Sequence, residues 1–290
     1  MKLNSIIEKI GSGSRGLFTR KRDDVPAPVM SHGFRNPYGA FRFKAHIGKN
    51  VQFEIHASNN LKDWRTVVSD TAPDEVVEYV DIDAHKFSYR FYRIVAGTVY
   101  SDNVYGYVTT TLPPGFSSIA NPFQTSACSV GELFADMPDG TKLHKFDATT
   151  FVVTDNELLR GKWTRPSERF VPGEGAIIFN PTSDYRPLSF MGNVMHGSFS
   201  VPIPSGFSMR SSLVPRPGQL VADLGFPMTD GDVIHLFDRE KQKYVLYKYD
   251  AERWESDPPV IGVAESFWVA KTAPGTWKQN LVLESEPAAA

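Results

Sequence analysis

The stretch Leu133-Phe-Ala-Asp-Met-Pro-Asp-Gly-Thr-Lys-Leu-His-Lys-Phe-Asp147 occurs a second time, as Leu224-Gly-Phe-Pro-Met-Thr-Asp-Gly-Asp-Val-Ile-His-Leu-Phe-Asp238. The leucine, the methionine, the Asp-Gly pair, the histidine and the Phe-Asp pair recur in place, and the copies start 91 residues apart, at 133 and 224. The same offset relates further pairs without a gap: Gly115 and Gly206, Phe116 and Phe207, Ser117 and Ser208, Trp163 and Trp254, Glu174 and Glu265. Self-similarity at a fixed period indicates an internal repeat. The C-terminal half is therefore predicted to be a duplicated β-rich unit.

Both copies predict the same local structure around this stretch. The pairs Asp139-Gly140 and Asp230-Gly231 favour hairpin turns, because glycine adopts a positive φ without strain. The side chains that follow alternate between two faces, with Leu143 and Lys145 on one and His144 and Phe146 on the other. We therefore expect a strand directly after each Asp-Gly turn.

The segment before the duplication has the pattern of many short strands. Side chains alternate over residues 40–45 and 51–57, and turn residues such as Asn59-Asn60 and Ala96-Gly97 separate the runs. This spacing of strands and turns is typical of an immunoglobulin or fibronectin type III-like sandwich. Residues 35–112 are therefore predicted to form such a sandwich, and the fold class of the whole chain is predicted to be all-β.

Two motifs of this segment resemble a known family. Ser58-Asn-Asn-Leu-Lys-Asp-Trp64 and Tyr89-Arg-Phe-Tyr-Arg-Ile94 are similar to fibronectin type III-like modules of verrucomicrobial and planctomycetal surface and exported proteins. The duplicated half is similar to the β-repeats that follow those modules, through Gly115-Phe116, Asp139-Gly140, His144-Lys-Phe-Asp147, Trp163, Gly173-Glu-Gly-Ala176 and Ala264-Glu-Ser-Phe-Trp268. The resemblance covers about residues 38–283. It implies structural β-modules and carries no assigned activity with it.

Four segments follow from these patterns: a basic arm at 1–34, the sandwich at 35–112, and β-repeats at 113–201 and 202–290. Prolines mark both joins around the first repeat, where they favour an extended backbone. Residues 1–22 contain six basic residues and one acidic residue, a net charge of +5 that includes the cluster Arg20, Lys21 and Arg22. The arm is expected to be a solvated chain end, or to bind an acidic neighbour in an assembly, with nucleic-acid contact as a third alternative.

Composition limits the class of protein. The chain has 31 basic and 33 acidic residues, and a net charge of −2 argues against a dedicated nucleic-acid binder. The lone cysteine, Cys128, cannot form an intrachain disulfide. The N-terminal ten residues lack the apolar core of a secretory signal, and no run approaches the roughly 20 apolar residues that span a bilayer. We therefore expect no membrane span, and a virion-associated location or export by a non-classical route.

No catalytic, cofactor-binding or metal-binding set is predicted. His144 and His235 occupy one repeat position, but each copy offers a single histidine, and a metal needs three or four converging ligands. A half-buried histidine bonded to a backbone carbonyl is the expected role. Glu174 and Glu265 fall in separate repeats, and a glutamate before an apolar strand is expected to accept backbone N–H bonds rather than to act as a glycosidase acid.

Aromatic residues supply the remaining candidates. Trp163 and Trp254 recur in the repeats and are expected to lie in the cores, although exposed aromatic rings can also stack on sugars. Tyr100, Tyr105 and Tyr107 fall in a segment, residues 99–111, in which Asp102 is the single charge. This segment is predicted to be a sheet edge that contacts either another chain or the first repeat.

These patterns favour a non-enzymatic structural or interaction protein, a subunit of a larger assembly such as a virion component or an extracellular filament or sheath. Its expected partners are further copies of the chain or other proteins of that assembly. The alternative is a carbohydrate-binding or adhesive surface module, for which a glycan would be the partner.

Overall fold

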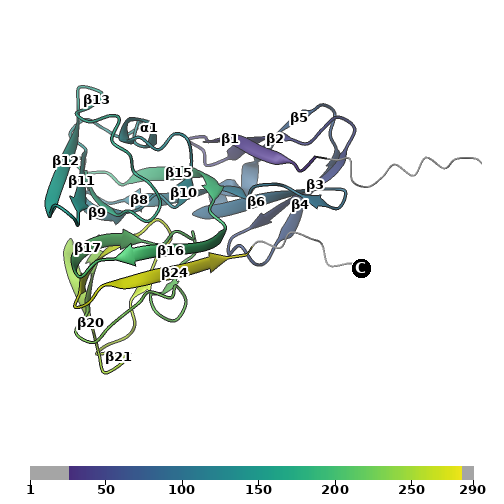
Figure 1. The fold of residues 1–290 in the computed structure, drawn as a ribbon. Coiled ribbons are helices and arrows are strands. Elements are labelled where there is room, and N and C mark those ends of the chain that lie inside the picture. The colour runs from purple at the N-terminus through teal and green to yellow at the C-terminus, as the bar shows by residue number, and fades with distance from the viewer. Residues whose placement is uncertain (1–25, 283–290) are drawn as a thin grey trace, which may run out of the picture.

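The computed structural model describes residues 26–282, and it is built almost entirely of strands (Figure 1). Within this range the helical segments are a 3-10 turn, η1 (Ile82–Lys86), and one short helix, α1 (Val130–Leu133). The all-β prediction is confirmed. The chain divides into an N-terminal sandwich and two further sheet units, each with its own buried apolar cluster.

The sandwich packs a three-stranded sheet on a larger one. The small sheet has the order β1-β2-β5, from strands β1 (Val29–Arg35), β2 (Phe41–His46) and β5 (Val76–Asp81). The facing strands are β4-β3-β6-β8: β4 (Arg65–Thr71), β3 (Gln52–Ser58), β6 (Tyr89–Ala96) and β8 (Tyr105–Leu112). Alternate side chains of each strand point into the core, which centres on the stacked rings of Phe41 and Tyr92, 5.6 Å apart.

The larger sheet continues past the sandwich into the first repeat. Strand β8 pairs on its other side with β15 (Arg186–Val194), which in turn pairs with β10 (Phe123–Gln124), while β7 (Val99–Tyr100) pairs with β6. Because side chains alternate along β8, Tyr107 lies in the sandwich core and Val108 in the core of the first repeat. The predicted boundary between residues 112 and 113 therefore falls within a region where one sheet serves both units.

The first repeat covers the second face of that sheet with five strands. Their order is β13-β12-β11-β14-β9, from β13 (Lys162–Trp163), β12 (Val152–Leu159), β11 (Lys142–Asp147), β14 (Ala176–Asn180) and β9 (Gly115–Ile119). Its core includes Phe134, Phe170 and Phe190, whose rings lie about 6 Å from one another, at 6.0, 5.9 and 6.4 Å between centroids. The unit is thus a sandwich of its own.

The second repeat has a five-stranded sheet of matching order, β21-β20-β19-β23-β17. Its strands are β17 (Gly206–Ser211), β19 (Val233–Asp238), β20 (Lys243–Asp250), β21 (Arg253–Trp254) and β23 (Ser266–Lys271). The pairing registers correspond as well: Lys142 lies opposite Glu157 in the first sheet and Val233 opposite Lys248 in the second, each 91 residues on. Two small sheets cover it, formed by β16 (Gly197–Ile203) with β24 (Gly275–Leu281) and by β18 (Gly218–Gln219) with β22 (Val260–Ile261).

Three expectations from the sequence need correction. The arm does not extend to residue 34, because β1 begins at Val29 and Met30, 2% exposed, pairs with Ala45. Residues 99–111 are not a sheet edge, because β15 pairs along the whole of β8, but the predicted contact with the first repeat is confirmed, since β15 belongs to that repeat. The Asp-Gly pairs are not hairpin turns: Gly140 does adopt a positive φ of 86°, but its turn leads into β11 from a loop. The hairpin lies further on, between β11 and β12.

Candidate functional site

The two repeated histidines lie on the outer faces of their sheets, and each stands beside a phenylalanine. His144 is 6.3 Å from Phe116 and His235 is 5.8 Å from Phe207, between ring centroids. His144 Nδ1 is 2.6 Å from the carboxylate of Asp155, because the two residues are opposite each other in the β11–β12 ladder. The partner of His144 is thus a side chain and not the backbone carbonyl that was expected. Partial burial lowers the pKa of His235. The structure does not bring the two histidines into one site.

The repeated glutamates make the same backbone bond in each copy. Val171 N donates to Glu174 Oε2 at 3.1 Å, and Gly262 N donates to Glu265 Oε2 at 2.7 Å. Burial raises the pKa of Glu265, whereas Glu174 is more open and lies 3.0 Å from the ammonium of Lys145. Each glutamate thus fixes the turn before a buried strand.

The repeated tryptophans differ between the copies. Trp163 is buried, and its indole N–H donates to the carbonyl of Phe134 at 3.3 Å. Trp254 is only half-buried and stacks edge-on against Tyr249. In the second copy the indole that donates to the equivalent turn belongs to Trp277, whose Nε1 lies 2.7 Å from the carbonyl of Leu224. Trp277 therefore fills, in the second copy, the core position that Trp163 has in the first copy and that Trp254 lacks.

The three candidate tyrosines belong to the sandwich. Tyr105 and Tyr107 are 9% and 0% exposed, so neither is available to a partner chain. Tyr100, on β7, is half-buried beneath the guanidinium of Arg93 at 4.6 Å. Arg20, Lys21 and Arg22 lie outside the described residues.

The two repeats contact each other through two equivalent hydrogen bonds, in which the donor and acceptor copies are interchanged. Ala120 N donates to Ala264 O at 2.9 Å, and Ser211 N donates to Gly173 O at 3.2 Å. Adding 91 to 120 gives 211, and adding 91 to 173 gives 264, so the two bonds are the same bond with the copies interchanged. The repeats therefore face each other like the subunits of an isologous dimer within one chain.

One side of this interface is closed by the β19–β20 turn. Gln242 Nε2 donates to Phe116 O at 2.8 Å, and its Oε1 accepts from Phe116 N at 2.7 Å. Arg239 Nη1 donates to Thr110 Oγ1 at 2.8 Å. On the other side the first copy has Phe151 where the second has Gln242, and a groove of about 350 Å³ lies there between Phe146 and Met209.

Gln242→Ala should lower the free energy of unfolding by about 1–2 kcal/mol, because it removes two hydrogen bonds to an edge strand. Phe151→Ala is the matched control, since Phe151 has the same repeat position and is 64% exposed. Urea denaturation of both variants measures the difference. Equal effects would show that Gln242 does not hold the copies together.

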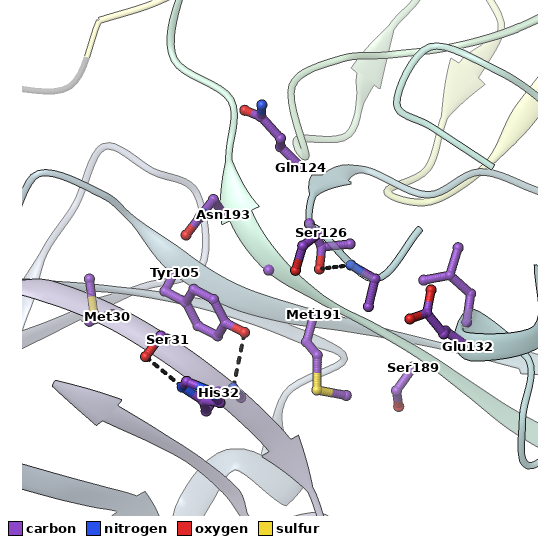
Figure 2. A pocket seen from close by; sticks show the side chains of 15 residues that line it. Met30, Ser31, His32, Tyr105, Gln124, Ser126, Glu132, Ser189, Met191 and Asn193 are labelled. Atoms are coloured by element: carbon purple, nitrogen blue, oxygen red, sulfur yellow. Dashed lines mark hydrogen bonds between the residues drawn. The ribbon is translucent and has the colours of Figure 1, made fainter. Parts of the chain in front are cut away.

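A second groove lies between the sandwich and the first repeat (Figure 2). A β-bulge in β1 between Ser31 and Phe34 creates one wall, and within it His32 has a positive φ of 54°. Gly33 fits against the Tyr105 ring, where an added Cβ would come within 2.5 Å, and its N–H donates to the Tyr105 hydroxyl at 3.0 Å. The groove measures about 450 Å³, and the other walls are β15, the loop after β10 and α1.

Polar groups of several kinds line this groove. Gln124, Ser126, Ser189 and Asn193 reach it from the first repeat, as Figure 2 shows. The hydrogen bonds that Ser129 donates to Glu132 hold the pKa of that carboxyl below its usual range, so the groove contains a carboxylate at neutral pH. His32 Nδ1 lies 2.8 Å from Ser31 Oγ, while Glu132 is bonded to Ser129 instead of orienting that imidazole. The groove is suited to hydrogen-bonding a polar ligand.

Residues 26–282 contain neither a cluster of metal-ligating side chains nor a membrane-spanning helix. No group of three or more histidine, cysteine, aspartate or glutamate side chains converges in a way that could hold a metal ion. No helix in the same range has the length and apolar character to cross a bilayer.

Sequence reasoning missed both grooves and one buried ion pair, Asp232 with Lys271. The groove of Figure 2 combines β1, the loop after β10 and β15, which are far apart in the chain and share no motif. The ion pair does have a signal in the sequence: the two repeat positions are Thr141 and Asn180 in the first copy, so both change together to charged residues.

Comparison with known proteins gives no assignment. No protein-family model matches the chain, and no curated protein matches it. One solved structure, described as the crystal structure of a tetra-tandem repeat in the extending region of a large adhesion protein, covers 89% of this chain and 74% of that chain. It shares 8% identity at a TM-score of 0.23, a level of likeness that identifies no family for this chain.

Proposed function

We propose that this chain is a non-enzymatic structural module that associates with further copies of itself in a larger assembly. The observation that supports it is the way the units are joined. β8 and β15 pair over eight residues, from Tyr105–Asn193 to Leu112–Arg186, so the sandwich and the first repeat share one sheet. Domains joined by a flexible linker move relative to each other by default, whereas a shared β-ladder holds two units at a fixed angle. Such a body is suited to spacing or bearing load.

A second feature is the apolar tip of the β11–β12 hairpin. Phe151, Val152 and Val153 are 64%, 52% and 53% exposed, although the same positions in the second copy carry Gln242, Lys243 and Tyr244. Exposed apolar groups that are contiguous in this way are typical of contact surfaces. A filament, a sheath or a virion component would use such a surface, and the resemblance to modules of bacterial surface and exported proteins is compatible with the same role.

Light scattering after size exclusion tests the proposal on the full chain. We expect species heavier than the 32.4 kDa monomer, with a share that rises with concentration. The double variant Phe151→Gln, Val152→Lys, which gives the first tip the residues of the second, should weaken association. Ile82→Lys, at a 73% exposed position of the sandwich, is the matched control and should not. A strictly monomeric chain at every concentration would overturn the proposal.

The basic arm has a separate test. A chain that lacks residues 1–25 keeps every described strand, so its circular dichroism should match that of the full chain. If the arm anchors the protein to an acidic neighbour, this variant should associate less. Undiminished association would assign the arm no role in assembly.

An adhesive, carbohydrate-binding module is the alternative, and one surface favours it. On the outer face of the second repeat, Phe207, Tyr244 and Leu246 are 49%, 41% and 52% exposed, and the His235 ring lies between Phe207 and Tyr244. Exposed aromatic rings beside polar groups can stack on sugars. Binding on a glycan array that Tyr244→Ala abolishes, by a chain that stays monomeric, would favour this function over assembly.

A further inference from the structure

The second repeat contains a fully buried lysine and aspartate in contact. Asp232 precedes β19, Lys271 ends β23, and these strands are antiparallel neighbours in one sheet. Both side chains are 0% exposed, and Lys271 Nζ lies against Asp232 Oδ2.

Every polar atom of the pair has a partner. Besides Asp232, Lys271 Nζ contacts the carbonyl of Pro227 at 2.7 Å and Thr229 Oγ1 at 3.1 Å. Thr229 N donates to Asp232 Oδ2 at 2.7 Å. Thr272 N lies 2.7 Å from Asp232 Oδ1 and Thr272 Oγ1 lies 3.0 Å from it. The side chains are therefore held in one relative position, with the amine beside the carboxyl group.

The first repeat shows that the fold does not need charges here. Its residues at these positions are Thr141 and Asn180, which are 0% and 1% exposed. Asn180 Nδ2 donates to the carbonyl of Asp184 at 2.8 Å, and the pocket is satisfied by neutral groups. Burying two opposite charges instead carries a desolvation penalty that their attraction often fails to offset. Folding alone thus gives no reason for an ammonium and a carboxylate at this place.

We propose that Lys271 and Asp232 condense into an amide, a covalent crosslink between β19 and β23. One proton passes from Lys271 Nζ to Asp232 Oδ2, the neutral amine attacks Asp232 Cγ, the bond from Cγ to Oδ2 breaks, and Oδ2 leaves as water after it has taken a second proton from Nζ. The two protons of that water come from the ammonium, which retains its third as the amide N–H. An ammonium and a carboxylate thereby become one neutral amide and one water molecule, and no further reactant is needed.

The contacts match what each step requires. As Nζ bonds to Cγ, negative charge develops on Oδ1, where the N–H and the hydroxyl of Thr272 are already in place as donors. Lys271 Nζ contacts Oδ2 directly, so the atom that loses protons lies against the one that gains them, while Thr229 holds both in place by accepting from Nζ with its hydroxyl and donating its backbone N–H to Oδ2. The full burial of both side chains excludes bulk water, which would favour the reverse hydrolysis.

The product would remove a buried ion pair and close a loop of 40 residues, from 232 to 271, that contains β19, β20, β21, β22 and β23. Such a loop closure restricts the unfolded chain. The C-terminal unit would then resist unfolding by heat or force, independently of whether the chain assembles.

Intact-mass spectrometry of the purified full chain under denaturing conditions tests the proposal. We expect a mass below that of the sequence by one water molecule, and a crosslinked peptide pair containing Asp232 and Lys271 after proteolysis. Lys271→Arg keeps the charge but cannot form this amide, and it should restore the full mass. Lys145→Arg is the matched control, because Lys145 pairs with Glu174 at 3.0 Å in a site that solvent reaches, with the glutamate side chain 41% exposed, and this variant should keep the deficit.

A deficit that grows as the folded protein is incubated would also support the crosslink, since it would measure the rate of the reaction. The full sequence mass after prolonged incubation would overturn it. So would a deficit that persists in Lys271→Arg, because the missing water would then come from elsewhere in the chain. Neither result bears on self-association, which light scattering measures separately.

Discussion

Raising the pH from about 9 to about 11 should lower the free energy of unfolding by about 3 kcal/mol, because three buried tyrosines resist ionisation in the folded sandwich. These are Tyr92, Tyr105 and Tyr107, which are 0%, 9% and 0% exposed. Their hydroxyl groups have partners inside the protein: the carboxylate of Asp81 for Tyr92, Gly33 N–H for Tyr105 and the carbonyl of Ala84 for Tyr107. A phenolate at any of these positions would be buried, and at Tyr92 it would also be repelled by the carboxylate of Asp81.

Burial is the main cause that raises the pKa of all three tyrosines, and the charge of Asp81 adds to it for Tyr92. The unfolded chain ionises near pH 10, whereas the folded chain retains its protons above that pH. Below pH 10 both states are protonated, so the stability is fully present there. It declines as the pH rises above 10, by about 1.4 kcal/mol per pH unit for each of Tyr92 and Tyr107, and Tyr105 contributes in the same direction.

Urea denaturation at a series of alkaline pH values measures the slope. Tyr107→Phe removes one titrating group and should reduce the slope by about a third. Tyr38→Phe is the control, because Tyr38 is 89% exposed and should leave the slope unchanged. If Tyr107→Phe and the unmodified chain lose stability in parallel, ionisation of Tyr107 is not coupled to unfolding.

The repeat was predictable because it depends on residues that are local to each copy. Asp-Gly turns, alternating strands and a glutamate before a buried strand each lie within a few residues, and the 91-residue offset places them in equivalent strands of the two sheets. The choice between the two predicted contacts of residues 99–111, another chain or the first repeat, was not predictable in this way. Whether β8 is an edge depends on β15, whose pairing residues start at Arg186, far along the chain. No local feature of the β8 sequence predicts that pairing.

The outer faces of the two repeats differ in polarity. β16 stands where β8 stands in the first copy, but Tyr107 corresponds to Ser198 and Thr109 to Ser200. Tyr107 is buried under the small sheet of the sandwich, whereas Ser198 and Ser200 are exposed. The outer face of β16 is therefore solvated, whereas the equivalent face of β8 is covered by the small sheet of the sandwich. This difference is visible in the sequence only once the two copies are aligned.

Gly175→Ala should lower the free energy of unfolding by about 1–3 kcal/mol, because the two repeats leave no space for a side chain at their shared contact. A Cβ at Gly175 would lie 2.6 Å from the Cβ of Ser266 and 2.7 Å from Cγ of Met209. Since 175 plus 91 is 266, the two residues are equivalent, and the interface brings each against the other. Gly175 is not among the residues with positive φ, so the expected loss comes from the clash and not from the backbone.

The equivalence of the two positions gives the prediction its sharpest test. Ser266→Gly removes the Cβ that an alanine at 175 would meet, so the double variant should recover part of the lost stability. Gly262→Ala is the matched control: its nearest neighbour would be the flexible end of Glu265 at 3.0 Å, and the first copy has Val171 at the equivalent position. Urea denaturation of the unmodified chain, Gly175→Ala, Ser266→Gly and the double variant gives the double-mutant cycle. Additive effects at 175 and 266 would mean that the two repeats do not meet at these residues, and the exchanged hydrogen bonds between Ala120, Ala264, Ser211 and Gly173 would then need another explanation.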